Sequence, residues 1–365
     1  MPPSDTAELD TAALTASVSL ADARAAGREA AAAMPPGARR PQAAVLLVFV
    51  AVLGLTLVLF APLSVRMLSN DPDAADIAFA VLGLTISVSM IAVPVWIAAR
   101  WLAQDRRRVR LRRFAEANGW TYRAWAPSGG AVGAAFEAGG DESLFDALRT
   151  GDRSVEFGRY TSVTGSGRSR RVVSTEVVTF HVPAELPHIV LDSRANDRAF
   201  GRSNLEFDPV RSQRLRLEGD FDRSFRLYCP TGYETDALYL LPPDIMQSLL
   251  DHARPLDVEL MGSTVRLYAP DGIITTDGDA WRRLLATVDA FRDMARQWAQ
   301  WRDDRLDPGA RLSPGLRPLG VAHEGRRLRT RFPWFAVFLG GVGLIVWLIS
   351  VIRDAAELVG GWLGG

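Results

Sequence analysis

Three long stretches without a charged side chain constrain this chain more than any other feature of its sequence. They cover residues 43–62, 77–99 and 333–352. About twenty residues of α-helix rise roughly 30 Å, which matches the hydrocarbon core of a bilayer. The sequence therefore predicts three transmembrane helices in a multi-pass protein of the cell membrane.

The arginines that flank these stretches predict the orientation. Thirteen arginines lie on one side: Arg39, Arg40, seven between positions 100 and 113, and four between positions 326 and 331. The other side has only Arg66 and Arg353. Because positively charged segments stay on the cytoplasmic side, the amino terminus and the region between the second and third spans are expected in the cytoplasm. The carboxyl terminus is expected outside.

The predicted organisation has six parts. They are a disordered amino-terminal tail (1–41), a two-helix transmembrane hairpin (42–102), a cytoplasmic domain (103–305), a Pro/Gly linker with a basic juxtamembrane segment (306–331), a third transmembrane helix (332–353) and a short external tail (354–365). The tail could also contain a loose helix over 9–34, because alanine favours helix.

The cytoplasmic domain is predicted to be α+β with a mainly antiparallel sheet and a long carboxy-terminal helix. Alternating valine, threonine and aromatic residues predict a hairpin of strands over 154–163 and 171–182. Further strands are expected at 120–125, 188–192, 215–217, 225–229 and 237–241, with a second hairpin over 256–261 and 264–269. Helices are expected over 245–253 and from 279 to about 305. The apolar stripe of the last helix predicts a core face.

Residues 217–251 carry a resemblance to known proteins. The pattern Phe221-x-x-x-Phe225-x-Leu-Tyr, followed by Ala237-x-Tyr-x-Leu-x-Pro and Met246, resembles an uncharacterised family of bacterial membrane-anchored proteins. That family places hydrophobic spans beside a cytoplasmic domain. The resemblance implies the same architecture here and no activity, cofactor or substrate.

Composition excludes several kinds of chemistry. All 42 basic residues are arginine, so neither a Schiff-base lysine nor the lysine of a Walker A loop is present. Cys229 is the only cysteine and the four histidines are widely spread, so no metal site is predicted from spacing. We therefore expect no cofactor. The net charge of zero gives no indication of nucleic-acid binding.

Three local groups are candidate sites. Glu218, Asp220 and Asp222 could bind a divalent cation or form a solvated turn. Cys229 could act as a nucleophile if His181 or His252 lay beside it, or be buried as a small apolar residue. The glycine turn over 165–171 contains Arg168, Arg170 and Arg171, which could hold an anion or a lipid phosphate, or it could simply be a basic hairpin tip. No catalytic, cofactor or metal residue is predicted.

Two belts of arginine flank the domain and could contact anionic lipid headgroups. Their members are Arg106, Arg107, Arg108, Arg110, Arg112 and Arg113 before the domain, and Arg326, Arg327, Arg329 and Arg331 after it. The same residues are also what the orientation rule requires, so both interpretations stay open.

The favoured function is a non-catalytic binding or scaffold module held at the bilayer, with a protein partner of unknown identity. The alternative is a membrane-anchored hydrolase that uses carboxylates of the domain. The candidates for that role are Asp192, Asp220, Asp222 and Asp244. A pocket that combines two of them with a histidine would favour the hydrolase.

Overall fold

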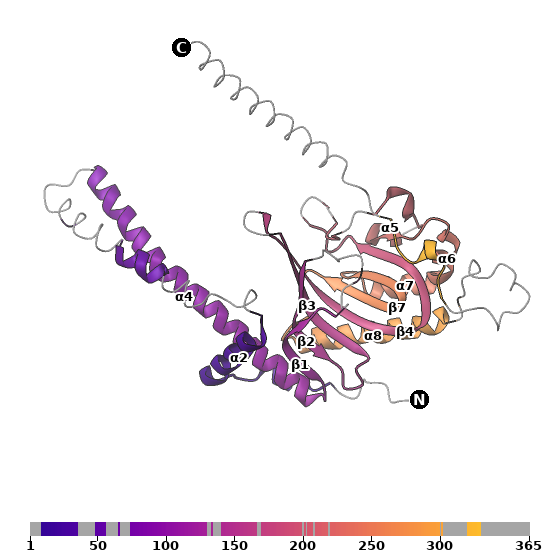
Figure 1. Cartoon of the computed structure of the whole chain (residues 1–365), viewed down its shortest axis with the longest axis horizontal. Helices are drawn as coiled ribbons and strands as arrows, with labels where there is room; N and C mark the ends of the chain where they lie inside the picture. The colour runs from indigo at the N-terminus through magenta and orange to yellow at the C-terminus, as the bar shows by residue number, and fades with distance from the viewer. Residues whose placement is uncertain are drawn as a thin grey trace, which may run out of the picture.

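The computed structural model shows a helix-covered antiparallel sheet from which one long helix projects (Figure 1). The structure describes residues 9–35, 48–55, 65, 74–129, 133, 140–165, 169–198, 201, 203–206, 209–217, 220–299, 301 and 320–329. The predicted α+β class with an antiparallel sheet is confirmed.

The projecting helix is α4, which runs without interruption over Ala74–Ala117, a length of 44 residues that includes Pro94. Its first part exposes large apolar side chains such as Val81, Leu84 and Val88. Its last part buries Leu111 and Phe114 in the core of the domain. The predicted boundary between membrane segment and domain therefore lies inside one helix, because nothing between positions 94 and 117 breaks helical geometry.

Only one described helix, within Val81–Ala117, is long and apolar enough to cross a membrane. Of the three predicted transmembrane helices, the described part of the chain therefore contains one candidate. Of the first predicted span only residues 48–55 are described, and they are helical. The third span, 333–352, lies outside the described residues.

The sheet has seven strands among the residues that the structure describes. They are β1 (Thr121–Pro127), β2 (Asp141–Arg149), β3 (Val155–Thr164), β4 (Arg171–Ser193), β5 (Arg214–Leu215), β6 (Phe225–Tyr228) and β7 (Asp257–Ala269). Their order is β1-β2-β3-β4-β6-β5, and β7 pairs with the other side of β4. The β3–β4 hairpin is confirmed, while β2 was not predicted.

Two predictions about strands are wrong. The expected hairpin over 256–269 is the single strand β7, because Gly262 (φ +58°) bends the chain without reversing it. Both halves of β7 then pair with β4, as at Leu260–Ile189 and Val265–Phe180. The expected strand over 237–241 is helix α6 (Glu234–Leu240).

Helices α7 (Pro243–His252) and α8 (Gly278–Trp298) pack on one face of the sheet, with the short α5 (Phe221–Ser224) beside them. The predicted stripe of α8 is buried, including Trp281, Phe291 and Trp298. The helix ends at Trp298 rather than near position 305. Its cap is Asp277, whose carboxylate accepts from the backbone N–H of Asp279.

The amino-terminal region differs from its prediction as a disordered tail. Helices α1 (Ala12–Thr15) and α2 (Leu20–Ala33) pack against the domain part of α4 (Figure 1). The alanines at positions 23, 26 and 30 form the buried face of α2. Small side chains let two helices approach closely, which offsets the lack of large apolar groups.

The predicted linker over 306–331 also contributes to the domain. The backbone N–H of Leu328 donates to His188 Nδ1 at 2.9 Å, and the N–H of Arg329 donates to Gln213 Oε1 at 2.9 Å. Leu328 is buried against the second face of the sheet. Residues 320–329 are therefore part of the folded unit.

Candidate functional site

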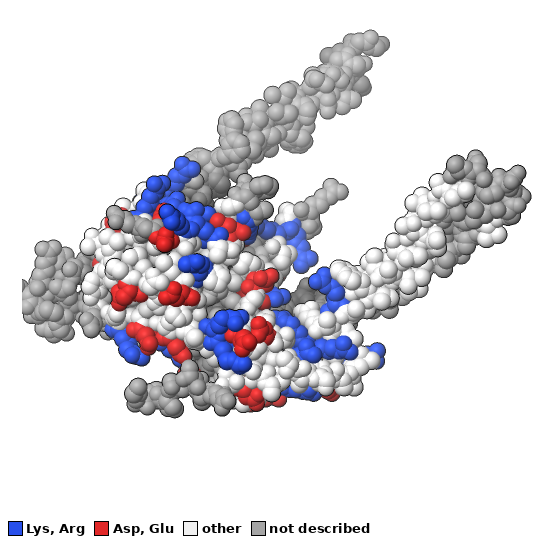
Figure 2. Space-filling view, turned by 180° about the vertical axis from the view of Figure 1, so that it is seen from behind, with Lys and Arg blue, Asp and Glu red and all other residues white. Residues whose placement is uncertain are grey.

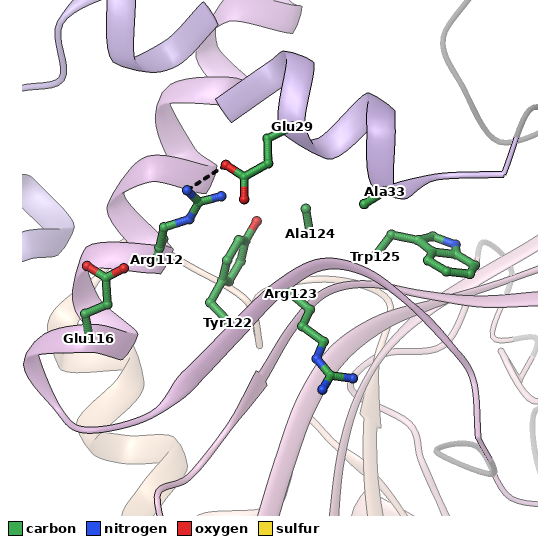
Figure 3. Close-up of a pocket in the computed structure, with 8 residues that line it drawn as sticks. All are labelled: Glu29, Ala33, Arg112, Glu116, Tyr122, Arg123, Ala124 and Trp125. Atoms are coloured by element: carbon green, nitrogen blue, oxygen red, sulfur yellow. Dashed lines mark ion pairs between the residues drawn. The ribbon is translucent and has the colours of Figure 1, made fainter. Parts of the chain in front are cut away.

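A groove lies between α2, α4 and the first strand of the sheet (Figure 3). Its cavity volume is about 500 Å³. Eight residues line it: Glu29 and Ala33 from α2, Arg112 and Glu116 from α4, and Tyr122, Arg123, Ala124 and Trp125 from β1. The groove therefore depends on the amino-terminal helices, which the sequence did not place on the domain.

An ion pair spans the groove from helix to helix. The guanidinium of Arg112 lies 2.8 Å from the Glu29 carboxylate and also sits over the ring of Tyr122, 5.9 Å from its centroid. The Tyr122 hydroxyl donates to Asp146 Oδ1 at 2.8 Å. Burial, with the Asp146 carboxylate beside it, raises the pKa of Tyr122 well above its usual range. The phenol therefore stays protonated and acts as an anchor for Asp146.

The groove follows the free edge of the sheet. In the described part of the chain, β1 pairs with β2 alone. Side chains of a strand alternate between its two faces, yet four consecutive residues, 122–125, line this one cavity. Figure 3 shows Tyr122 directed toward α2 and Arg123 directed away from it. The cavity is therefore open to the edge of β1 itself.

A second pocket of about 310 Å³ lies against the β1–β2 pair. Arg123 lines both cavities. The second pocket also contains Arg149, Arg153 and Glu156, of which Arg149 and Glu156 form an ion pair at 2.7 Å. Arg123 and Arg153 are exposed and have no ion-pair partner among the described residues. The second pocket is thus basic.

Five of the six arginines in the first predicted belt are used inside the protein. Arg107 reaches Asp146 at 3.0 Å and the carbonyl of Ile274, and Arg108 pairs with Asp105 at 2.9 Å. The other three bind the amino-terminal helices: Arg110 donates to Ala16 O, Arg112 pairs with Glu29, and Arg113 pairs with Asp22 at 3.0 Å. Arg106 is exposed.

The second belt is less tied to the domain. Arg326 donates from Nε to the carbonyl of Val321 at 2.9 Å, and its side chain, like those of Arg327 and Arg329, is exposed. Arg331 lies outside the described residues. Figure 2 shows basic side chains where the uncharged projecting helix meets the body of the protein.

The carboxylates considered for hydrolysis each have a different partner. Asp192 is buried and pairs with Arg226 at 2.9 Å, Asp220 pairs with Arg223 at 2.9 Å, and Asp222 lies 3.7 Å from Arg214. Asp244 accepts from Gln297 at 3.4 Å. No group of three His, Cys, Asp or Glu side chains in the described residues could hold a metal ion. Glu218, the third carboxylate of the group with Asp220 and Asp222, lies outside the described residues.

Cys229 has the properties of a core residue. Burial raises the pKa of its thiol to about 12, with Glu234 and Asp236 adding to the rise. His181 hydrogen-bonds with Thr264, and His252 with the backbone of Ser248. A buried thiol with so high a pKa is protonated at neutral pH, which favours the interpretation of Cys229 as a small apolar core residue. The glycine turn over 165–171 lies partly outside the described residues, and its Arg171 pairs with Glu206.

A buried polar network crosses the second face of the sheet, and sequence reasoning missed it. His188 Nε2 lies 2.9 Å from Glu259 Oε1, and the Tyr268 hydroxyl donates to Glu259 Oε2 at 2.6 Å. Because His188 Nδ1 accepts from Leu328, Nε2 carries the proton and donates to Glu259. All three side chains are fully buried. These hydrogen bonds connect β4, β7 and residues 320–329.

Comparisons with known proteins give no family for this chain. No protein-family profile matches it, and no curated protein resembles it in sequence. A solved structure, the mycobacterial trehalose monomycolate transport factor A (TtfA), aligns with 52% of this chain and 95% of its own at 11% identity, with a TM-score of 0.32. Similarity of this size establishes neither fold nor function.

Proposed function

We propose that this protein is a membrane-tethered, non-catalytic binding module whose sheet domain is carried by α4. The observation that supports the proposal best is the continuity of α4 from its exposed apolar part to its buried part. A helix without a loop between the two parts fixes the domain at a set distance and orientation from the bilayer. Such a constraint suits a module that presents a surface to a partner.

The bilayer surface is expected near Trp96 and Arg100. The Arg100 guanidinium lies over the Trp96 ring, 4.8 Å from its centroid, and Trp and Arg commonly occupy the interfacial region. Contact with the domain begins at Asp105, which is buried. Five residues of helix rise roughly 8 Å, so the domain would lie close to the headgroups.

The proposal keeps the contact between arginines and lipid headgroups, but for five of the ten arginines only. The five arginines with internal partners, 107, 108, 110, 112 and 113, would stabilise the junction rather than bind lipid. Arg106, Arg326, Arg327, Arg329 and Arg331 would contact anionic headgroups. The proposed topology keeps the amino terminus and the sheet domain in the cytoplasm, with the carboxyl terminus outside.

The ion pairs of the candidate carboxylates favour the binding module over the hydrolase. A general acid or base must be free to exchange a proton with a substrate in a pocket. Asp192 is held by Arg226 and by the hydroxyl of Ser203 at 2.9 Å. Asp220 and Asp222 each lie beside an arginine on the surface.

The test is capture of the full-length, tagged chain from its native membrane, with quantitative mass spectrometry of the proteins that copurify. The chain should stay in the membrane pellet after an alkaline wash. The same set of partners should copurify with wild type and with the Asp220→Asn, Asp222→Asn and Asp244→Asn variants. Release of the chain by the wash, or a set identical to that of an unrelated tagged membrane protein, would contradict the proposal.

A further inference from the structure

We propose that the free edge of β1 binds an extended, acidic segment of a partner protein, which adds to the sheet as an eighth strand. This inference rests on the proposed binding function and names its site. An edge strand presents unpaired backbone N–H and C=O groups and is a ready template for another strand. Such an edge is usually blunted or covered, whereas here a cavity of about 500 Å³ lies along β1.

The two cavities suit the two faces of an added strand. Alternate side chains of a bound strand point to opposite faces of the sheet. One set would enter the groove beneath α2, and the other would reach the basic pocket against the β1–β2 pair, which Arg123 joins to the groove. The four lining residues 122–125 span roughly 13 Å of strand, so a short segment is sufficient.

The positive charge of the basic pocket indicates which side chains of the partner segment would face it. Three arginines line it against the one carboxylate of Glu156, which already pairs with Arg149. Arg123 and Arg153 have no ion-pair partner among the described residues and are available to bind an anionic group. Arginine forks bind carboxylates through paired, charge-assisted hydrogen bonds. The partner segment should therefore carry Asp or Glu at every second position on this side.

The backbone at Arg153 is held in a defined turn. Its φ of 60° lies in the left-handed region, which residues other than glycine rarely adopt. The turn is held in this conformation by hydrogen bonds from Thr150 Oγ1 and from the backbone N–H of Ser154 to Asp152 Oδ1, at 2.6 and 3.0 Å. A single residue in the left-handed region is common in hairpin loops such as the one between β2 and β3. The conformation of the turn presents Arg153 at the basic pocket.

The groove on the α2 side accepts small or apolar side chains. Ala33 and Ala124 leave the space there, and the Arg112–Glu29 pair neutralises the charge of its end wall. Trp125 completes the wall of the groove on β1.

The experiment selects binders from a random library of ten-residue peptides, using the full chain in lipid nanodiscs. Selected peptides should carry acidic residues at alternate positions. Binding of a selected peptide should slow amide hydrogen exchange within residues 121–127. Methylation of every second backbone nitrogen of that peptide should abolish binding, because it removes the N–H groups that pair with β1.

Matched variants separate this site from other surfaces. Replacing Arg123→Glu together with Arg153→Glu should weaken binding of the selected peptide about tenfold or more. The Arg216→Glu variant alters an exposed arginine after β5 and should leave the affinity unchanged. Unchanged exchange at 121–127, or full affinity of the Arg123/Arg153 variant, would overturn the proposed site. If a selected peptide slows hydrogen exchange at a different surface, the β1 edge is not the binding site, whereas the proposed binding function is still supported.

Discussion

Trp281 is the residue on which most of the aromatic core converges. Its ring lies 5.1 Å from that of Phe114, 5.2 Å from Phe157 and 6.0 Å from Trp120, centroid to centroid. Its indole N–H donates to the carbonyl of Thr275 at 2.8 Å. One side chain of α8 thus joins the end of α4 to the sheet, so the projecting helix and the sheet share a single core.

Phe291, three turns further along α8, tests the importance of this core. Its ring is buried and lies 6.0 Å from Phe180 and 6.4 Å from Trp298. Replacing Phe291→Ala should lower the free energy of unfolding by about 3–5 kcal/mol, because the cavity left behind cannot collapse fully. Chemical denaturation of the full chain in nanodiscs measures this. A loss below about 1 kcal/mol would mean that the neighbouring rings refill the space.

Asp257 predicts how stability depends on pH. Burial, with Asp192 nearby, raises the pKa of Asp257 from 3.8 to about 7. Between these two pKa values, Asp257 is protonated in the folded state and ionised in the unfolded state. The stabilising contribution is complete below the unfolded pKa and is lost as pH rises through the folded pKa.

The free energy of unfolding should thus decrease by a few kcal/mol from about pH 4 to about pH 7. The pKa of Asp192 is also raised by burial, so it changes stability in the same direction. The Asp257→Asn variant, which cannot titrate, should show a flatter profile in denaturation measured across this range. An equally steep profile in the variant would assign the effect to Asp192 or another group.

At the scale of elements, the packing of α2 on α4 creates the groove. Gly27 of α2 lies so close to α4 that an added Cβ would be 2.5 Å from Asp105 Oδ2. Replacing Gly27→Val should displace α2, while the same change at the exposed Ala32 should not. Limited trypsin digestion followed by mass spectrometry should show faster cleavage after Arg24 and Arg28 in the Gly27 variant. Equal cleavage in both variants would contradict the packing of α2 on α4.

The sequence pattern predicted those helices and strands in which the spacing of apolar residues matches the face that is buried. The α8 stripe and the β3–β4 hairpin are such cases, since one face of each is buried in the core. The segment 237–241 is a short apolar run that resembles a buried strand. In the structure it belongs to helix α6, and the indole N–H of Trp298 donates to the carbonyl of Leu240. The two apolar runs of β7 resemble a hairpin because Gly262 separates them, and only their shared partner β4 shows a single strand.

The candidate site was harder to predict from sequence than the fold. The basic run from Arg106 to Arg113 was interpreted as an orientation signal and a lipid contact, yet its side chains reach partners up to 167 residues away, as between Arg107 and Ile274. Such contacts leave no local pattern. The buried alanines of α2 at positions 23, 26 and 30 were the available signal, and their spacing suggests a close helix contact.

At the scale of the whole molecule, the proposed topology predicts which parts reach the cytoplasm. A reporter that is active only outside the cytoplasm should be active when fused at Gly365 and inactive when inserted at the exposed Gly201. The reason is the asymmetry of thirteen arginines against two. The opposite pattern of reporter activity would reverse the orientation of the chain.

The continuity of α4 is the central structural claim, and a distance measurement across it is the most direct test. Val88 and Arg106 are both exposed and lie five helical turns apart on one face of α4, roughly 27 Å along the axis. Spin labels are attached to cysteines introduced at these two positions in a Cys229→Ala background. Pulsed electron paramagnetic resonance of the protein in nanodiscs then measures the distance between the labels. A single narrow distribution near 27 Å is predicted, with Pro94 lying between the labels. A broad or clearly shorter distribution would mean that the helix is hinged, and the domain would not be held in a fixed orientation at the membrane.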